Sequence, residues 1–223
     1  MTDYSLTIAL PKGKLFAPSA EILEQIGFNT RDFSDESRSL VFEDPARKAR
    51  FIICRPTDIP TYVEHGAADL GIVGKDSIIE AARNLYELVD LGFGFCRFVI
   101  AAPRQALAGN NSYAWKPGVR IATKFPLIAR DYLQRKGLQA EIIKLHGNVE
   151  LAPLVGLADL IVDLVSTGKT LQENNLVPLE EIGQATARLI VNRASYRLKA
   201  AEINMLVTKL KTILQTQGGE VTP

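Results

Sequence analysis

The chain contains few of the residues that mark special structural classes. Only two of its 223 residues are cysteines, Cys54 and Cys96, and only two are histidines, His65 and His146. The two cysteines lie in or beside apolar runs, so we expect buried, reduced thiols rather than a disulfide framework or a zinc site. The two histidines are too far apart in the sequence to indicate a metal centre.

Long apolar runs and an excess of one charge are also missing. No run approaches the roughly 18 apolar residues of a membrane-spanning helix. The N-terminus enters a strand-like run directly, without the basic and apolar regions of a signal peptide. A net charge of +1 provides no overall field that would attract nucleic acid or a membrane. These absences predict a cytoplasmic protein that binds neither, so positive charge for anionic ligands must be gathered locally.

Apolar, strand-like runs alternate with helical patterns along most of the chain, which predicts a mostly parallel sheet. The expected strands are 6–10, 40–42, 49–54, 70–73, 96–102, 119–122, 140–144, 160–164 and 188–192. The expected helices are 15–26, 57–64, 75–83, 126–136, 150–155, 170–174 and 198–212. We expect the C-terminal tail, 218–223, to be loose.

A polar, irregular segment, 103–118, separates two β-α series, and a crossover falls near 92–103. The sequence therefore predicts two α/β lobes. Lobe I comprises 1–94 with 184–223, and lobe II comprises 95–183. Two similar lobes place a ligand cleft between them, beside the carboxyl ends of strands.

The most informative segment is 161–171, where a strand-like run containing Asp163 leads into a loop and then a helical run. The loop offers hydroxyl and backbone N–H groups, which suit a phosphate. Its residues are Ser166, Thr167, Gly168, Lys169 and Thr170. Asp163 repels a phosphate and so is expected to face sugar hydroxyls. Together these features predict a site for a phosphorylated ribose.

Two other interpretations of this segment deserve comparison. Gly168-Lys169-Thr170 matches the second half of a nucleoside-triphosphate P-loop, but position 163 holds aspartate where the first glycine belongs. The other interpretation is an ordinary strand-to-helix turn in which Ser and Thr cap the helix. The sequence argues against the first and leaves the second open.

Cations are found at further strand ends. Lys12, Gly13 and Lys14 lie between the first strand and the first helix, where a bound anion would explain lysines at a helix start. Arg38 precedes a strand, and Arg55 follows one. Guanidinium groups suit diphosphates and triphosphates. The alternatives are exposed loop lysines and arginines in surface ion pairs.

Several motifs, in order, resemble the ATP phosphoribosyltransferase family over nearly the whole chain. They are I-V-D-L-V-S-T-G-K-T-L-Q-E-N-N-L, L-P-K-G-K-L, R-P-T-D-I-P-T-Y-V-E-H-G-A-A-D-L-G-I-V-G-K-D, I-A-T-K-F, K-L-H-G-N-V-E-L-A-P-L-V-G-L-A-D and R-L-I-V-N. The chain departs from the family pattern twice. Lys14 replaces the usual arginine, and Lys169 stands where a small or neutral residue is common.

The resemblance implies a two-lobed, periplasmic-binding-protein-like (type II) α/β fold. It implies transfer of the 5-phosphoribosyl group from phosphoribosyl diphosphate to N1 of ATP, the first step of histidine biosynthesis, with Mg²⁺ held by the substrate phosphates. The chain's length resembles the family's short form. That form implies a regulatory subunit similar to histidyl-tRNA synthetase, a hetero-octamer, a dimer when alone, and histidine feedback inhibition through the partner.

The resemblance also suggests roles for individual residues. Lys14 and Arg38 would act in catalysis by stabilising the leaving diphosphate. The phosphoribosyl group would be bound by Glu150, Asp163, Ser166, Thr167, Gly168, Lys169 and Thr170. The ATP and diphosphate would be bound by Lys12, Gly13, Arg55 and Lys75.

Two other functions compete with this one. A two-lobed solute-binding module without catalysis would share the architecture, because a fold does not determine a function. Such a module has no need of the loop after Asp163. A phosphoribosyltransferase that acts on another base would share the loop, and only the resemblance along the whole chain argues against it.

Overall fold

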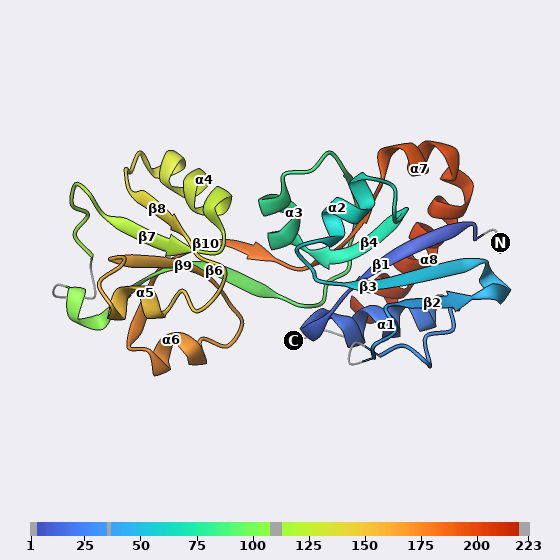
Figure 1. The fold of residues 1–223 in the computed structure, drawn as a ribbon, viewed down its shortest axis with the longest axis horizontal. Coiled ribbons are helices and arrows are strands. Elements are labelled where there is room, and N and C mark those ends of the chain that lie inside the picture. Colours follow the sequence, from blue (N-terminus) through green and yellow to red (C-terminus); the bar gives the residue numbers. More distant parts are fainter. Residues whose placement is uncertain (1–3, 35–36, 108–112, 219–223) are drawn as a thin grey trace. The chain divides into compact units, whose positions relative to one another are not determined.

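The structure is a computed structural model that describes residues 4–34, 37–107 and 113–218. Its internal contacts divide the chain into two units (Figure 1). Unit 1 comprises Met1–Gly94 and Thr186–Pro223, and unit 2 comprises Phe95–Ala185. The chain therefore returns from unit 2 to unit 1 after residue 185, two residues later than the boundary at 183 expected from the sequence. Residues 219–223 of the expected loose tail lie outside the described residues.

Unit 1 is built on a six-stranded sheet with the order β2-β3-β1-β4-β11-β5. Its strands are β1 (Leu6–Pro11), β2 (Val41–Asp44), β3 (Ala49–Cys54), β4 (Leu70–Gly74), β5 (Tyr86–Asp90) and β11 (Ala187–Val191). Strand β1 pairs in parallel with β3 and β4, whereas β2 and β11 pair antiparallel with their neighbours. Strand β11 reaches the sheet only after the chain has passed through unit 2, and it lies between β4 and β5.

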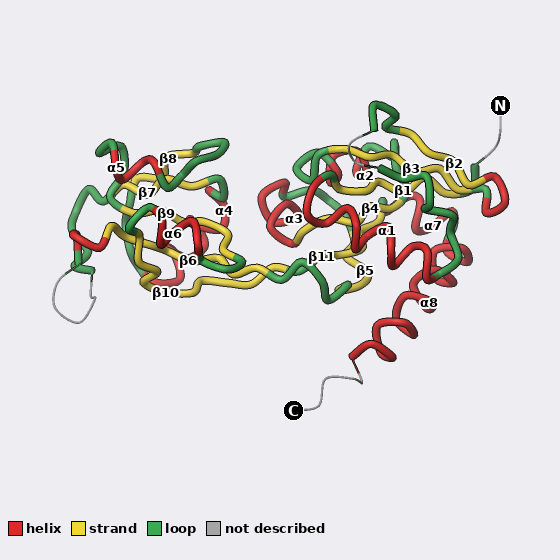
Figure 2. The backbone as a smooth tube through the Cα atoms, turned by 90° about the horizontal axis from the view of Figure 1, so that it is seen from below, coloured by secondary structure: helices red, strands yellow, loops and turns green. Residues whose placement is uncertain are grey.

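Helices cover both faces of this sheet because its central strands are apolar on both sides. In β1, Ile8 and Leu10 pack in the cluster that holds α1 (Phe16–Gln25) and α8 (Ala200–Gly218), and Ala9 faces α2 (Ile59–Glu64). Figure 2 shows α1 and α8 on the same side of the sheet. The remaining helices are α3 (Lys75–Ala81), α7 (Arg193–Leu198) and the short 3₁₀ turns Gly13–Leu15 and Pro45–Arg47.

Unit 2 is built on a five-stranded sheet with the order β10-β6-β9-β7-β8. Its strands are β6 (Cys96–Pro103), β7 (Arg120–Thr123), β8 (Glu141–Lys144), β9 (Leu160–Val165) and β10 (Leu176–Ala185). Its helices are α4 (Pro126–Lys136), α5 (Leu151–Leu154), α6 (Lys169–Glu173) and the 3₁₀ turn Arg104–Ala106. Strand β7 pairs in parallel with β8 and β9, and β6 pairs antiparallel with β9 and β10.

The alternation of side chains along β9 separates the two cores of unit 2. Leu160 and Val162 pack in the cluster that includes α4, whereas Ile161 and Val165 pack with residues of α5 and α6. Because successive side chains in a strand point to opposite faces, Asp163 shares the face of Ile161 and Val165. The sequence pattern therefore places a carboxylate on the α5 and α6 side of the sheet.

Several sequence-based expectations are corrected. The sheets are not mostly parallel, because parallel pairing is confined to β3-β1-β4 and β8-β7-β9. The helix expected over 15–26 begins as a 3₁₀ turn at Gly13. Cys54 and Cys96 are half-buried rather than buried, and neither forms a disulfide. Strands β5 and β10 and helix α7 were not predicted.

Within the described stretches, no helix combines the length and the apolar character needed to cross a bilayer.

Candidate active site

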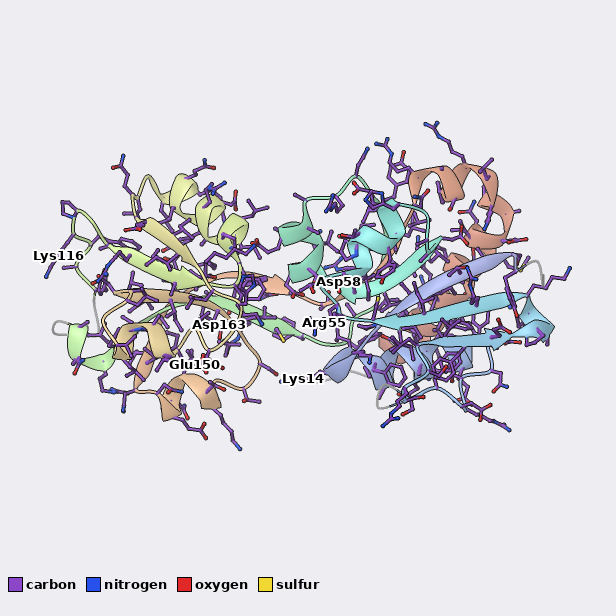
Figure 3. The ribbon with its side chains drawn as sticks, in the orientation of Figure 1. Lys14, Arg55, Asp58, Lys116, Glu150 and Asp163 are labelled. Carbon is purple, nitrogen blue, oxygen red and sulfur yellow. The ribbon has the colours of Figure 1, made fainter. Side chains whose placement is uncertain are left out.

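Asp163 is the central acidic group of unit 2, and most of its surface is buried. Burial raises the pKa of this carboxyl group, and the nearby Glu150 raises it further. A hydrogen bond from the backbone N–H of Leu164 and the charge of Lys124 act in the opposite direction. Figure 3 shows Asp163 and Glu150 together in this unit. Two carboxylates held this way can accept hydrogen bonds from a sugar diol.

Lys124 is brought to Asp163 by the pairing of neighbouring strands. Thr123 ends β7 opposite Val162 of β9. Its buried hydroxyl donates to the Val162 carbonyl at 2.7 Å and accepts from the Phe125 N–H at 2.9 Å. These bonds fix the turn from which Lys124 projects. Only the structure connects Lys124 to Asp163.

The loop between β9 and α6 is short and has unused hydrogen-bonding groups. Strand β9 ends at Val165, and Gly168 occupies the cap position of α6 in a left-handed conformation with φ 81°. Within the described residues, the hydroxyls of Ser166, Thr167 and Thr170 bond to no protein group, and no side chain caps the helix. The interpretation of these hydroxyls as helix caps is therefore wrong. A P-loop is also excluded, because its first glycine position, 163, lies inside β9.

We expect Gly168→Ala to raise the Kd for a phosphorylated ribose about tenfold and to lower stability by about 1–2 kcal/mol, because an L-residue is strained at this φ. Isothermal titration and thermal unfolding would measure the two effects. Gly183→Ala is the matched control. A Cβ added there would lie 3.6 Å from Phe98, which is an ordinary contact, and Gly183 has no positive φ. Equal effects of the two substitutions would contradict the role assigned to Gly168.

In unit 1, two cations leave neighbouring parallel strands at the same end of the sheet. Pro11 of β1 pairs with Cys54 of β3, and the Lys12 N–H donates to the Cys54 carbonyl at 2.9 Å. Lys12 and Arg55 therefore follow their strands side by side, and both line a hollow of about 440 Å³. Burial raises the pKa of the Cys54 thiol to about 11, with Asp58 adding to the rise and Lys12 opposing it.

Gly13, Lys14 and Arg38 lie around the same strand ends. Gly13 has φ 81° and opens the 3₁₀ turn that carries the exposed Lys14. Arg38 is exposed and approaches β2, where the Ile53 N–H donates to the Leu40 carbonyl at 2.8 Å. Because β2 runs antiparallel to β3, the residues just before β2, which include Arg38, lie near the end of β3 that Arg55 follows.

Lys75 is in a different situation from the other predicted cations. It begins α3, and its ammonium group lies 2.7 Å from a carboxylate oxygen of Glu87. Both side chains are about one-third exposed. A phosphate that binds Lys75 must therefore compete with this ion pair.

Several other cations of the candidate site remain available for a ligand. Within the described residues, no ion pair of 4 Å or less involves Lys12, Lys14, Arg38, Arg55 or Lys124, although many other lysines and arginines are paired. Unpaired positive charge gathered at strand ends, in a chain with a net charge of only +1, suits an anionic ligand.

Two residues of the hollow were not identified from the sequence. Asp58 lies at the start of α2 and Tyr62 four residues later, so both occupy one side of this helix. Both line the hollow with Arg55. The sequence signal for these two residues is that they follow Arg55 by three and seven positions. This spacing indicates a shared site only when the position of α2 against the end of β3 is known.

Comparisons with known proteins show what the chain as a whole is similar to. The model of the family described as HisG: ATP phosphoribosyltransferase matches residues 55–212. An ATP phosphoribosyltransferase of Moorella thermoacetica is 55% identical over 223 residues, which cover 99% of this chain and 97% of that protein.

Solved structures give the same result. A chain of the ATP phosphoribosyl transferase (HisG:HisZ) complex from Thermotoga maritima is 37% identical, with a TM-score of 0.78, and the match covers 95% of this chain and 99% of that one. A substrate-binding protein of an amino acid ABC transporter, 13% identical with a TM-score of 0.57, shares the fold over 96% of this chain and 94% of its own. The fold is thus of the periplasmic-binding-protein type, and the chain belongs to the ATP phosphoribosyltransferase family.

Proposed function

We propose that this protein transfers the 5-phosphoribosyl group of phosphoribosyl diphosphate to N1 of ATP and releases diphosphate, as the first step of histidine biosynthesis. The observation that carries the proposal is the family match over 55–212, which includes both Arg55 and the loop after Asp163. A cytoplasmic location is part of the same proposal.

The donor is held by unit 2. The loop residues Ser166–Thr170 bind the 5′-phosphate through their hydroxyl and backbone N–H groups, and the ammonium group of Lys169 adds positive charge. Asp163 and Glu150 accept hydrogen bonds from the ribose hydroxyls. Their negative charge also offsets the positive charge that develops on the ring as the bond to diphosphate breaks. The unused hydroxyls of the loop and the proximity of the two carboxylates support these roles.

The acceptor and the leaving group are held by the cations of unit 1. Adenine N1 carries a free lone pair at neutral pH, so its attack on C1, with inversion, requires no strong general base. The protein must position two polyanions and stabilise the departing charge. Lys14 and Arg38 stabilise the diphosphate. Lys12, Gly13 and Arg55 bind the ATP or diphosphate phosphates, and Lys75 does so in competition with Glu87.

Magnesium accompanies the substrates, held chiefly by phosphate oxygens and water. In the part of the chain that the structure describes, no group of three or more His, Cys, Asp or Glu side chains could hold a metal ion. When bound, Mg²⁺ neutralises diphosphate charge, and the side chains of this protein hold the remaining phosphate oxygens.

We expect Asp163→Asn to weaken donor binding about 30-fold, to leave ATP binding unchanged and to stabilise the unliganded protein at neutral pH. The pKa of Asp163 is raised by burial, so the folded state retains the proton to a higher pH than the unfolded state does. As pH rises from the pKa of Asp163 in the unfolded state through its raised pKa in the folded state, ionisation of Asp163 therefore lowers the free energy of unfolding.

Titration calorimetry and thermal unfolding at several pH values would measure these effects of Asp163→Asn. The stability difference between the wild type and the variant should shrink on acidification. Asp131→Asn is the control, because Asp131 is exposed and pairs with Arg135 on α4. Equal weakening of donor and ATP binding would contradict the ribose assignment of Asp163.

The proposal includes a regulatory partner. The Thermotoga maritima chain belongs to a HisG:HisZ complex, and the match covers 99% of that chain. We propose a corresponding complex here, a hetero-octamer with a subunit similar to histidyl-tRNA synthetase, and a dimer when the catalytic chain is alone. Histidine then inhibits through the partner. Copurification, light scattering and histidine titration of the complex test this part.

The activity is tested by incubating the protein, with and without its partner, with ATP, phosphoribosyl diphosphate and Mg²⁺. The expected product absorbs at longer wavelength than ATP, and diphosphate is released in equal amount. A solute-binding module would bind a small molecule without forming either product, and this outcome would overturn the proposal. Product formation with a different base, but not with ATP, would indicate another phosphoribosyltransferase.

A further inference from the structure

The hollow at the ends of β1 and β3 has two chemically distinct sides. Lys12 and Arg55 provide positive charge on one side. The other side is formed by Leu40, Val41 and the ring of Tyr62, which are 46%, 49% and 42% exposed. Cations beside an exposed apolar wall suit a ligand that has an anionic tail and a flat apolar ring, as a nucleoside triphosphate does.

One further group in the hollow can recognise the ring. Of the described residues that line it, only Asp58 carries a carboxylate. Asp58 is exposed at the start of α2, makes no cap hydrogen bond there, and accepts only a long hydrogen bond of 3.4 Å from the adjacent Thr57 hydroxyl. Figure 3 shows it close to Arg55 at the same end of the sheet. Its oxygens are therefore available to a donor on the ligand.

We propose that Asp58 accepts a hydrogen bond from the exocyclic 6-amino group of adenine, with the ring seated against Tyr62 and the phosphates on Lys12 and Arg55. The inference rests on the proposed function and makes Asp58 a residue that selects and activates the acceptor. The opposite arrangement, with phosphates at Asp58, would place like charges together.

The reaction itself gives this contact a role in catalysis. The N1 lone pair forms the new bond to C1 of the donor, while the bond from C1 to the diphosphate oxygen breaks and diphosphate leaves with the electron pair. The adenine ring gains one positive charge, shared by N1, C6 and the amino nitrogen, and loses it when an amino proton passes to water. A carboxylate that accepts from the amino group binds the charged ring more strongly than the neutral one.

The same contact with Asp58 also selects adenine over purines that carry an oxygen at position 6. Guanine and hypoxanthine carry an oxygen at position 6, and a carboxylate facing that oxygen would meet an acceptor rather than a donor. A buried or ligand-covered polar group without a partner strongly disfavours binding. Purines with a 6-oxo group are therefore rejected at Asp58.

The experiment compares kcat/KM for ATP and for purine riboside 5′-triphosphate, which keeps N1 but lacks the 6-amino group. We expect Asp58→Ala to lower kcat/KM for ATP about 100-fold and to have little effect with the analogue, so that discrimination between the two nucleotides largely disappears. Asp58→Asn keeps an acceptor oxygen without the charge and should give an intermediate result. Asp131→Asn is the control for the loss of an exposed aspartate.

Equal losses with both nucleotides would overturn the assignment. Loss of discrimination against 2′-deoxy-ATP instead would also overturn it, because Asp58 would then recognise the ribose. These outcomes require an active wild-type protein. An inactive wild type would overturn the proposed function, and the two failures are therefore distinguishable.

Discussion

Replacing Arg55 with alanine should lower kcat/KM for ATP by about 1000-fold while the melting temperature stays close to that of the wild type. Arg55 is exposed, follows the buried strand β3 and lines the hollow with Lys12. Within the described residues it forms no ion pair of 4 Å or less, so its removal leaves no carboxylate unpaired. Removing one partner of a hydrogen-bonded charge pair that a bound ligand covers commonly costs about 2–5 kcal/mol, which corresponds to roughly 10²- to 10³-fold in kcat/KM.

Arg55→Lys keeps the charge but loses the planar pair of donors, so we expect it to recover only part of the activity. Arg135→Ala removes an arginine of α4 that pairs with Asp131 on the surface, and it should leave kcat/KM unchanged. Steady-state kinetics and calorimetry of the three variants would test the role. Wild-type turnover by Arg55→Ala would show that Arg55 does not act on the substrate, and unfolding of this variant would show that Arg55 stabilises the fold.

Replacing Asp69 with alanine should produce the largest loss of stability, about 4 kcal/mol, and should lower the melting temperature by roughly 10 °C. Asp69 is 7% exposed and immediately precedes β4. Its carboxylate accepts from the Thr7 N–H at 2.8 Å, from the Ser195 hydroxyl at 2.6 Å and from the Lys199 ammonium at 2.8 Å. It thus joins β1, α7 and the start of α8.

The loss arises because Asp69→Ala leaves three donors without an acceptor, one of them the charged Lys199. Thermal and urea unfolding of Asp69→Ala, Lys199→Ala and the double variant would measure the coupling between the two residues. Asp131→Ala, which breaks the exposed Asp131–Arg135 pair, should cost less than about 1 kcal/mol. If Asp69→Ala and Asp131→Ala had equal effects, the bonds at Asp69 would not stabilise the fold.

The elements with strong apolar periodicity could be predicted from the sequence. Strand β3 and helix α4 have the predicted bounds, because a short, largely apolar run and an amphipathic run each favour one structure. Strand β10 could not be predicted in the same way. It contains Pro178 and Gly183, has two register shifts against β6 and lies at a sheet edge, where such residues are tolerated.

The candidate site also has a part that could be predicted from the sequence and a part that could not. The loop 166–168 and the cations at strand ends are visible in the sequence, because a strand that leads into a polar loop and a helix has a local signature. The partners of these residues depend on contacts between distant segments. The sequence could not indicate that Glu87 holds Lys75, or that Lys124 lies close enough to Asp163 to affect its pKa.

Strand β11 follows unit 2 in the sequence although it belongs to the sheet of unit 1, and this order affects folding during synthesis on the ribosome. Strand β5 pairs only with β11 among the described strands, so it has no neighbour until residues 187–191 have emerged. Unit 2 is one uninterrupted segment and can fold before unit 1 is finished. A nascent chain that stops short of Ala187 would therefore expose the open edges of β4 and β5, a form that chaperones would be expected to retain.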